Sequence, residues 1–479
     1  MRAHIACVLG LIPTSACMGD AEVALTREQL LDPQACKTCH PAHYEQWSAS
    51  MHAYAAEDPV FLAMNRRAQE EAQLGDFCVK CHAPMAVREG LTVDGLNLAE
   101  LPNKMKGVTC YFCHNAVDVE GDHSNRLILA NDTIMRAGIR DPIDPGAHQA
   151  AYSEFHDRNL EKSSRMCGAC HDFVTPAGVF LERTFAEYRE TLFASPASPS
   201  FDTCQGCHME GRFGVIANVP GVPARRPHDH IWAGVDIALT EFPHRDAMRA
   251  AVEECALPNS IQYFSFEPAM SGRSTFVATL ETSAGHGQPS GASQDRRMWL
   301  EVIAYDRANQ VVFQSGVVAD NMSEEPVLNG PEPVWALHEQ IFGADEKPVH
   351  MFWEAAPSAR YPMGYEERAL PGAKTAVSGG HSKSFYFTLP LKLPKRAEFR
   401  VRMRPIGFDV LGDLVASGHL APELIAQMPT FTLYSAVVEW ADEPVTPNDF
   451  TLRTTSFPDC QRYRCMFEAS PTGKVNACP

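Results

Sequence analysis

The sequence predicts an α+β protein, in which a mainly helical and irregular N-terminal domain is followed by a β-sandwich domain. Three observations predict it. Up to about residue 235 the chain repeats one Cys-containing motif and is interrupted throughout by Pro and Gly. From residue 236 that motif is absent, and apolar and polar residues alternate as in half-buried strands. The length of 479 residues and an apolar content of 45% are those of a folded protein with more than one domain.

The N-terminus has the pattern of an export signal. Met1 and Arg2 precede a short apolar segment, residues 5–13, which is too short to span a bilayer and is followed by small residues. The signal can be processed in two ways: by cleavage near Ala21, or by cleavage before Cys17 with a lipid on that Cys as a membrane anchor. We expect residues 1–21 to be a signal peptide, and the protein to act in the periplasm or on the outer-membrane or extracellular side.

Ten of the 16 Cys lie in five Cys-x-x-Cys-His motifs, whereas composition alone predicts roughly 0.02 copies. In this motif two thiols bind the two vinyl groups of one haem, and the His that follows reaches the iron as proximal ligand. Paired Cys also build zinc sites, but those do not need a His after each second Cys. We therefore expect residues 30–235 to form a haem-packed domain with five c-type haems. The residues that hold them are Cys36, Cys39 and His40; Cys78, Cys81 and His82; Cys110, Cys113 and His114; Cys167, Cys170 and His171; Cys204, Cys207 and His208.

The second axial ligand of each iron is sought among the other His residues. Eight lie in or just beyond the motif region: His43, His52, His123, His148, His156, His228, His230 and His244. For His43 and His244 we favour an exposed or hydrogen-bonded side chain over a ligand. Two His ligands close an iron to substrate and suit electron transfer, whereas an open position indicates binding or catalysis.

Several motifs resemble a known family. Cys36-x-x-Cys39-His40-Pro41 with the later Trp47-x-x-Ser50-x-His52, and Gly107-Val108-Thr109 before the third motif, resemble the multihaem cytochromes of the c554/c-prime type, typified by the tetrahaem cytochrome of ammonia oxidisers. The last two motifs and the segments 285–291 and 297–302 resemble a larger exported branch with an added C-terminal β domain. The resemblance implies distal roles for His52, His123, His148, His156 and His230. This chain departs from the family in having five motifs rather than four.

Helix-capping residues and the alternation of apolar and polar residues predict the main helices and strands. Asp58, Pro59 and Gly75 delimit a helix over residues 60–74. In the β-sandwich domain, residues 236–479, we expect strands over 274–282, 297–305, 310–316, 384–389, 398–404 and 430–440, with a helical insert over 407–428. His286 lies in a Gly-flanked loop of this domain, where it is either a distal haem ligand or a residue that stabilises its own turn.

Four further Cys lie outside the motifs and beyond the signal: Cys255, Cys460, Cys465 and Cys478. An even number in an exported chain predicts two disulfides, for which Cys460 with Cys465 and Cys255 with Cys478 is one pairing. Free thiols are the alternative.

The formal charge of −18, without a basic block, argues against a nucleic-acid partner. An acidic surface favours basic redox partner proteins, such as other cytochromes or quinol-linked donors. We expect an electron carrier rather than an enzyme, with no catalytic residue assigned. The alternatives are an oxidoreductase acting on a small nitrogen or sulfur compound at one open haem, and a filament that joins haem rows of adjacent subunits.

Overall fold

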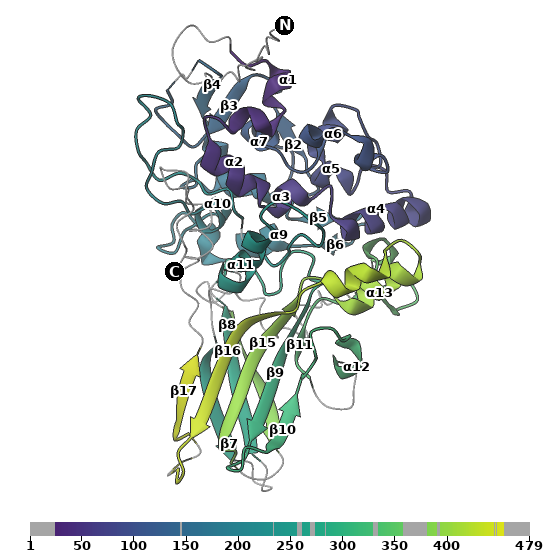
Figure 1. The fold of residues 1–479 in the computed structure, drawn as a ribbon, viewed down its shortest axis with the longest axis vertical. Coiled ribbons are helices and arrows are strands. Elements are labelled where there is room, and N and C mark those ends of the chain that lie inside the picture. The colour runs from purple at the N-terminus through teal and green to yellow at the C-terminus, as the bar shows by residue number, and fades with distance from the viewer. Residues whose placement is uncertain are drawn as a thin grey trace, which may run out of the picture.

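The structure is a computed structural model that describes residues 24–143, 146–232, 234–255, 261–268, 274–282, 284–328, 334–357, 381–389, 393–444, 446 and 448–454. Short helices form one end of the molecule and long strands the other (Figure 1). The chain is thus α+β, as predicted. The signal peptide, Cys17 and the three Cys after residue 455 lie outside the described residues, as does the side chain of Cys255, so the predicted disulfides stay predictions. No helix in the described ranges is long and apolar enough to cross a membrane.

The N-terminal half, up to residue 235, consists of short elements joined by irregular chain. Its helices are α1 (Arg27–Leu30), α2 (Pro41–Ser48), α3 (Met51–Tyr54), α4 (Pro59–Ala72), α5 (Val79–His82), α6 (Pro84–Arg88), α7 (Cys110–His114), α8 (Lys162–Gly168), α9 (Thr184–Arg189) and α10 (Cys204–His208). Its strands are β1 (Ala116–Val119) with β2 (Leu127–Leu129), β3 (Ile134–Ala137) with β4 (Gln149–Tyr152), and β5 (Phe173–Val174) with β6 (Phe180–Leu181). Regular structure is sparse here, as the Pro and Gly content predicts.

The long helix of this half, α4, begins and ends as its sequence predicts to within two residues. The Asp58 carboxylate accepts the Val60 N–H at 3.0 Å, and Pro59 occupies the first turn. The helix ends earlier than expected because Gln73, not Gly75, takes the first left-handed position, at φ 52°. Val60 and Ala63 are buried on the side that meets the C-terminal half.

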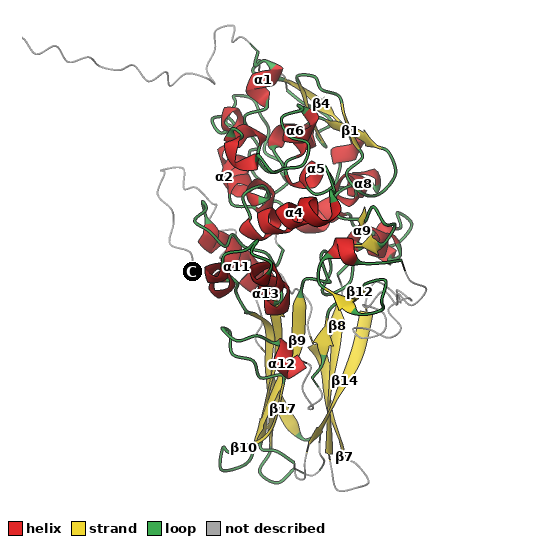
Figure 2. Cartoon of the chain, turned by 90° about the vertical axis from the view of Figure 1, so that its right-hand side faces the viewer, coloured by secondary structure: helices red, strands yellow, loops and turns green. Residues whose placement is uncertain are grey.

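The C-terminal half is built from two antiparallel sheets (Figure 2). One has the order β10-β9-β15-β16-β17 with β11 also paired to β9, and the other has the order β14-β8-β7. The strands are β7 (Ile261–Pro268), β8 (Ser274–Thr282), β9 (Arg297–Tyr305), β10 (Val311–Ser315), β11 (Ala336–Leu337), β14 (His381–Leu389), β15 (Arg396–Arg404), β16 (Phe431–Trp440) and β17 (Phe450–Thr454). All six expected strands are present, and β7, β11 and β17 are additional.

The two sheets share one apolar core. Phe264 on β7 and Phe387 on β14 both contact Phe399 on β15, with ring centres 5.5 and 6.5 Å apart. Val302 and Val438, on the neighbouring strands of the larger sheet, are fully buried in the same cluster. The predicted helical insert is α13 (Phe408–Ala416) followed by a 3-10 helix over Pro422–Gln427. A short hairpin, β12 (Ile341–Phe342) and β13 (Pro348–Val349), and the helices α11 (Arg245–Cys255) and α12 (Glu325–Leu328) complete this half.

The two halves meet along α4 and α13 (Figure 1). Leu411 and Leu414 of α13 are buried against Val60 and Ala63 of α4, and the Arg67 guanidinium forms an ion pair with Asp413 at 3.2 Å.

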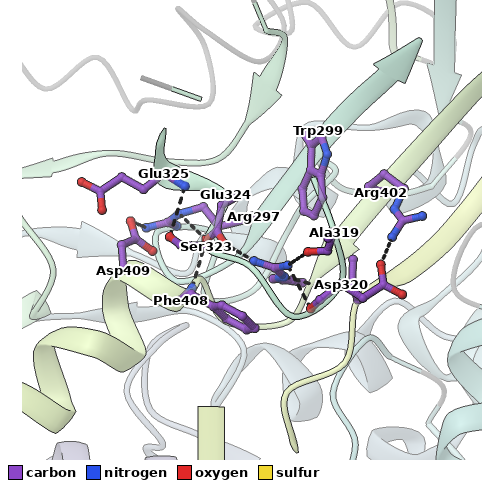
Figure 3. A network of polar contacts seen from close by, with 12 residues as sticks. Arg297, Trp299, Ala319, Asp320, Ser323, Glu324, Glu325, Arg402, Phe408 and Asp409 are labelled. Carbon is purple, nitrogen blue, oxygen red and sulfur yellow. Dashed lines mark hydrogen bonds and ion pairs between the residues drawn. The ribbon is translucent and has the colours of Figure 1, made fainter. Parts of the chain in front are cut away.

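A buried polar network fixes α13 to the larger sheet (Figure 3). Arg404 and Glu324 are fully buried and form an ion pair, and Glu324 also accepts the Phe408 N–H at 3.0 Å. Arg297 binds Asp409 at 2.7 Å. The start of α13 is therefore tied to the ends of β9 and β15.

Candidate haem-binding site

A cavity of about 1850 Å³ runs through the N-terminal half and is lined by all ten Cys and all five proximal His of the motifs. Helical turns aim these residues inward. In α5, α7 and α10, the second Cys and the His of the motif lie three and four residues after the first Cys, so all three share one helix face. In the first motif, His40 directly precedes α2.

The proximal His rings are oriented by hydrogen bonds on one nitrogen. The Nδ1 atom of His40 lies 2.9 Å from the Ile216 carbonyl oxygen, that of His82 lies 3.0 Å from Ala55, and that of His114 lies 2.6 Å from Arg136. A ring that bonds the backbone through Nδ1 leaves Nε2 to ligate a metal. His171 differs, because its Nδ1 faces the Glu182 carboxylate at 3.4 Å.

Four of the five proximal rings have a second imidazole at a common distance. A metal–imidazole bond is about 2 Å long and the ring centre lies roughly 1 Å behind the ligating nitrogen, so two imidazoles on opposite sides of one iron have centres about 6 Å apart. The observed pairs are His40 with both His148 at 6.3 Å and His43 at 6.0 Å, His171 with His52 at 6.2 Å, His208 with His286 at 6.2 Å, and His114 with both His230 at 6.0 Å and His156 at 5.7 Å.

The two rings beside His114 differ in which nitrogen is engaged. His230 bonds the His228 carbonyl through Nδ1 at 3.0 Å, which leaves Nε2 available. His156 instead uses Nε2, which lies 2.8 Å from the Cys113 carbonyl oxygen, and its buried Nδ1 has no partner. The arrangement of His230 is the one expected of an axial ligand.

His123 is the predicted distal candidate that the structure does not bring to a proximal ring. Its Nδ1 lies 2.8 Å from the Asp122 carboxylate, and the residue does not line the cavity. Its ligand role stays a prediction. His244 pairs with Glu45 at 2.9 Å, in keeping with the hydrogen-bonded role expected of it.

His43 and His228 line the cavity as well. The His43 ring centre lies 4.8 Å from that of His230, and His43 is hydrogen-bonded to the backbone of His228. The sequence predicted a hydrogen-bonded side chain for His43 but not its burial. That burial arises only in the folded chain, which brings residues 43 and 230 together. His228 is one of the eight His residues named from the sequence, and it lies two residues before His230.

Burial keeps these imidazoles neutral. It lowers the pKa of His52 to about 3, that of His156 to about 3 and that of His43 to about 4. Neutral imidazole is the form that ligates a metal, so no proton has to be removed at neutral pH.

The motifs lie next to one another in pairs. The thiol of Cys110 lowers the pKa of the Cys36 thiol, Cys170 lowers that of Cys81, and Cys167 lowers that of Cys204, so the two thiols of each pair are neighbours. The first site therefore adjoins the third, the second adjoins the fourth, and the fourth also adjoins the fifth.

The remaining cavity wall fits a large apolar ring that carries carboxylates. Arginines line the cavity: Arg136, Arg140, Arg158, Arg225, Arg226 and Arg296. A nitrogen of Arg158 and one of Arg225 are buried without a hydrogen-bond partner. Arg225 also binds the Asp141 carboxylate at 2.7 Å, whereas Arg158 donates to the Pro227 backbone carbonyl. A buried guanidinium group favours an anionic partner, which a haem propionate would supply to Arg158. Cysteines, paired imidazoles and these orphan donors together fit covalently bound haem.

Comparison with known proteins gives two matches. Residues 35–115 match the family model described as cytochrome c554 and c-prime. The fold is similar to the crystal structure of a penta-heme cytochrome c552 from Thermochromatium tepidum, with 18% sequence identity and a TM-score of 0.56 over 86% of this chain and 99% of that chain. No curated protein matches the chain.

The site and the fold thus define a c-type cytochrome with several haems. More narrowly, the family segment and the shared fold confirm the resemblance drawn from the motifs and support a multihaem cytochrome of the c554 type.

Proposed function

We propose that the chain binds five c-type haems and transfers electrons along them between redox partner proteins outside the cytoplasm. The observation that carries this proposal is the set of four imidazole pairs, each about 6 Å apart across the cavity. Two imidazoles occupy both axial positions of an iron, and such a site exchanges electrons without binding a substrate.

Bound haem supplies the one-electron chemistry of iron, which changes between Fe(III) and Fe(II). The protein's part is to hold the sites next to one another and keep water out. The thiols of Cys36 and Cys110 bring the first and third motifs together, and those of Cys81, Cys170, Cys167 and Cys204 bring together the second, fourth and fifth. Cys113 of the third motif interacts with Cys167 and Cys170 of the fourth, which relates the two groups to each other. This connection supports transfer from one site to the next.

The acidic charge of −18 supports a basic partner protein and a brief, salt-sensitive encounter. Export, a lipid on Cys17 and partners among other cytochromes or quinol-linked donors belong to the same proposal. Production in a host that matures c-type cytochromes tests it. We expect five haems per chain by pyridine haemochrome, and reduction of a basic acceptor that slows as salt rises. Fewer than five haems would contradict the count, and salt-independent exchange would contradict the acidic docking surface.

A second candidate function rests on His82. Its imidazole stacks on Phe61, with ring centres 3.9 Å apart and planes at 2°, and no ring contact in the described part of the chain places a second imidazole about 6 Å from it. This favours an open position at the second site, where a small nitrogen or sulfur compound would react. Cyanide or nitric oxide titration separates the two functions: a spectral change at one haem supports the open site, and no change leaves only electron transfer.

A further inference from the structure

The proximal ring of the fourth site has a different partner from those of the first, second and third sites. Its Nδ1 faces a carboxylate oxygen of Glu182 at 3.4 Å, whereas His40, His82 and His114 face neutral backbone carbonyls. His171 and Glu182 both line the cavity. A carboxylate on the outer nitrogen of an axial imidazole makes the ring a stronger electron donor than a carbonyl does.

The backbone holds Glu182 in an unfavourable conformation. Its φ is +46°, a left-handed value that residues other than Gly rarely adopt, at the junction between β6 and α9. The preceding Leu181 is buried with Ile341 and Ala355 of the C-terminal half. Packing therefore maintains a strained residue at a point where its side chain meets a haem ligand, a placement that is common at functional sites.

We propose that Glu182 lowers the reduction potential of the fourth haem relative to the sites whose proximal His binds a backbone carbonyl. The inference rests on the proposed function, because it concerns the iron that His171 would hold. A more basic axial ligand stabilises Fe(III) over Fe(II). Two ionisable groups of the C-terminal half interact with Glu182: Asp295, whose own pKa is raised by burial to about 7, and the cation Arg296. Arg296 already forms an ion pair with Asp236 at 3.0 Å. Its positive charge is therefore shared between two carboxylates and does not fully neutralise the negative charge of Glu182.

The fourth site lies between the second and the fifth, so its reduction potential affects electron transfer between them. The thiol of Cys81 in the second motif raises the pKa of Cys170, and that of Cys204 in the fifth raises the pKa of Cys167, so the fourth motif neighbours both. A low potential at this junction makes reduction of the fourth haem the least favourable step between the second and fifth sites. Glu182 would then decide how electrons are shared between the two ends.

The ring geometry supplies a way to recognise the fourth haem. The planes of His171 and His52 cross at 74°, whereas those of the pairs formed by the other predicted distal ligands cross at 12° to 28°. Nearly perpendicular axial imidazoles give low-spin Fe(III) a more anisotropic electron paramagnetic resonance spectrum than parallel ones do. A His52→Ala variant confirms the assignment, because it removes that signal and no other.

The test is a redox titration of the holoprotein monitored by this resonance, in the wild type, Glu182→Gln and Glu190→Gln. Glu190 is an exposed carboxylate at the end of α9 and serves as the matched control. In Glu182→Gln, near the midpoint, we expect the Fe(II) to Fe(III) ratio of the fourth haem to rise about tenfold, which is about 59 mV for one electron. The other haems and the control are expected to stay within a small fraction of that shift.

An unchanged potential of the fourth haem in a variant that holds five haems would overturn this inference and leave the proposed function intact. An equal shift of all haems would also overturn it, since that is a general charge effect. If Glu182→Gln fails to mature, Glu182→Asp gives the same test, because the shorter side chain withdraws the carboxylate from Nδ1 and raises the potential in the same direction. A wild-type protein with fewer than five haems contradicts the proposed function instead.

Discussion

The imidazole of His286 lies with its ring centre 6.2 Å from that of His208, although the two residues belong to different halves of the molecule. His286 is held in place by its own backbone, through Nδ1 and the Gly287 carbonyl oxygen at 2.9 Å. The C-terminal half therefore brings a second imidazole next to the proximal His of the fifth motif, which supports the proposal that His286 ligates that haem iron.

Replacement of His286 by Ala should convert one low-spin haem into a high-spin haem, because the fifth iron loses its second axial ligand. Electron paramagnetic resonance of the oxidised protein measures this change. His244→Ala is the control, since His244 pairs with Glu45 and does not line the cavity. An unaltered low-spin count in His286→Ala would show that another residue ligates the fifth iron.

The loop that carries His286 is held by Glu187 of α9. One oxygen of its carboxylate accepts the Gly287 N–H and the Ser290 hydroxyl, each at 2.9 Å. Glu187→Ala should leave the Gly287 N–H without its partner, while Ser290 keeps its contact with the Thr184 hydroxyl at 2.7 Å. We expect a local cost of about 1–3 kcal/mol, so that the fifth site becomes a mixture of low-spin and high-spin forms. Near-infrared magnetic circular dichroism follows the mixture. Glu190→Ala on the same helix is expected to change nothing, and identical spectra for the two variants would refute the role of Glu187.

The buried pair of Arg404 and Glu324 should stabilise the fold, because replacing one of the two leaves the charge of the other buried without its main partner. We expect Arg404→Met to cost about 3–5 kcal/mol, with partial recovery when Glu324→Gln removes the remaining charge. Denaturant unfolding followed by far-ultraviolet circular dichroism measures both. Arg453→Met breaks the exposed pair with Glu439 and should cost less than about 1 kcal/mol. Equal losses for the buried and exposed pairs would contradict this assignment.

Glu339 should make the stability of the protein fall as pH rises. Burial raises the pKa of this carboxyl from 4.5 to about 7, although its oxygen accepts the Ser293 hydroxyl at 2.8 Å. Between about pH 4.5 and 7 the folded state binds more protons than the unfolded state, so the free energy of unfolding decreases by up to about 1.4 kcal/mol per pH unit and is level above that range.

Thermal unfolding of wild type and Glu339→Gln across pH 5 to 8 checks the sign. The variant, which has no carboxyl to ionise, should lose less stability over that range, and the exposed control Glu423→Gln should follow the wild type. A variant with the wild-type pH slope would contradict the raised pKa.

Local patterns were sufficient to predict much of the fold, and they are the basis on which the haem-attachment residues are proposed. A Cys-x-x-Cys-His turn needs only its own residues, and strands such as β8 and β9 follow from alternation over nine positions each. The helix α4 begins where Asp58 and Pro59 predict. The strand β7 was not predicted, because its apolar and polar residues alternate only weakly and Pro268 ends it.

The distal ligands could not be assigned from the sequence because each imidazole pair joins distant segments. His52 and His171, or His208 and His286, meet only after the chain has folded. Proximity to a motif favoured His123 equally, yet Asp122 beside it offers a local partner. The contact between Glu182 and His171 could not be predicted either, because the β5 and β6 hairpin separates the two residues in the sequence.

Spin quantification by electron paramagnetic resonance of the fully oxidised holoprotein tests the central claim most directly, since that claim is that paired imidazoles ligate the haem irons. We expect at least four low-spin, His/His-ligated irons per chain, one of them the anisotropic signal of the His171 and His52 pair. Fewer than four such irons, or a majority of high-spin or His/Met signals, would contradict the account.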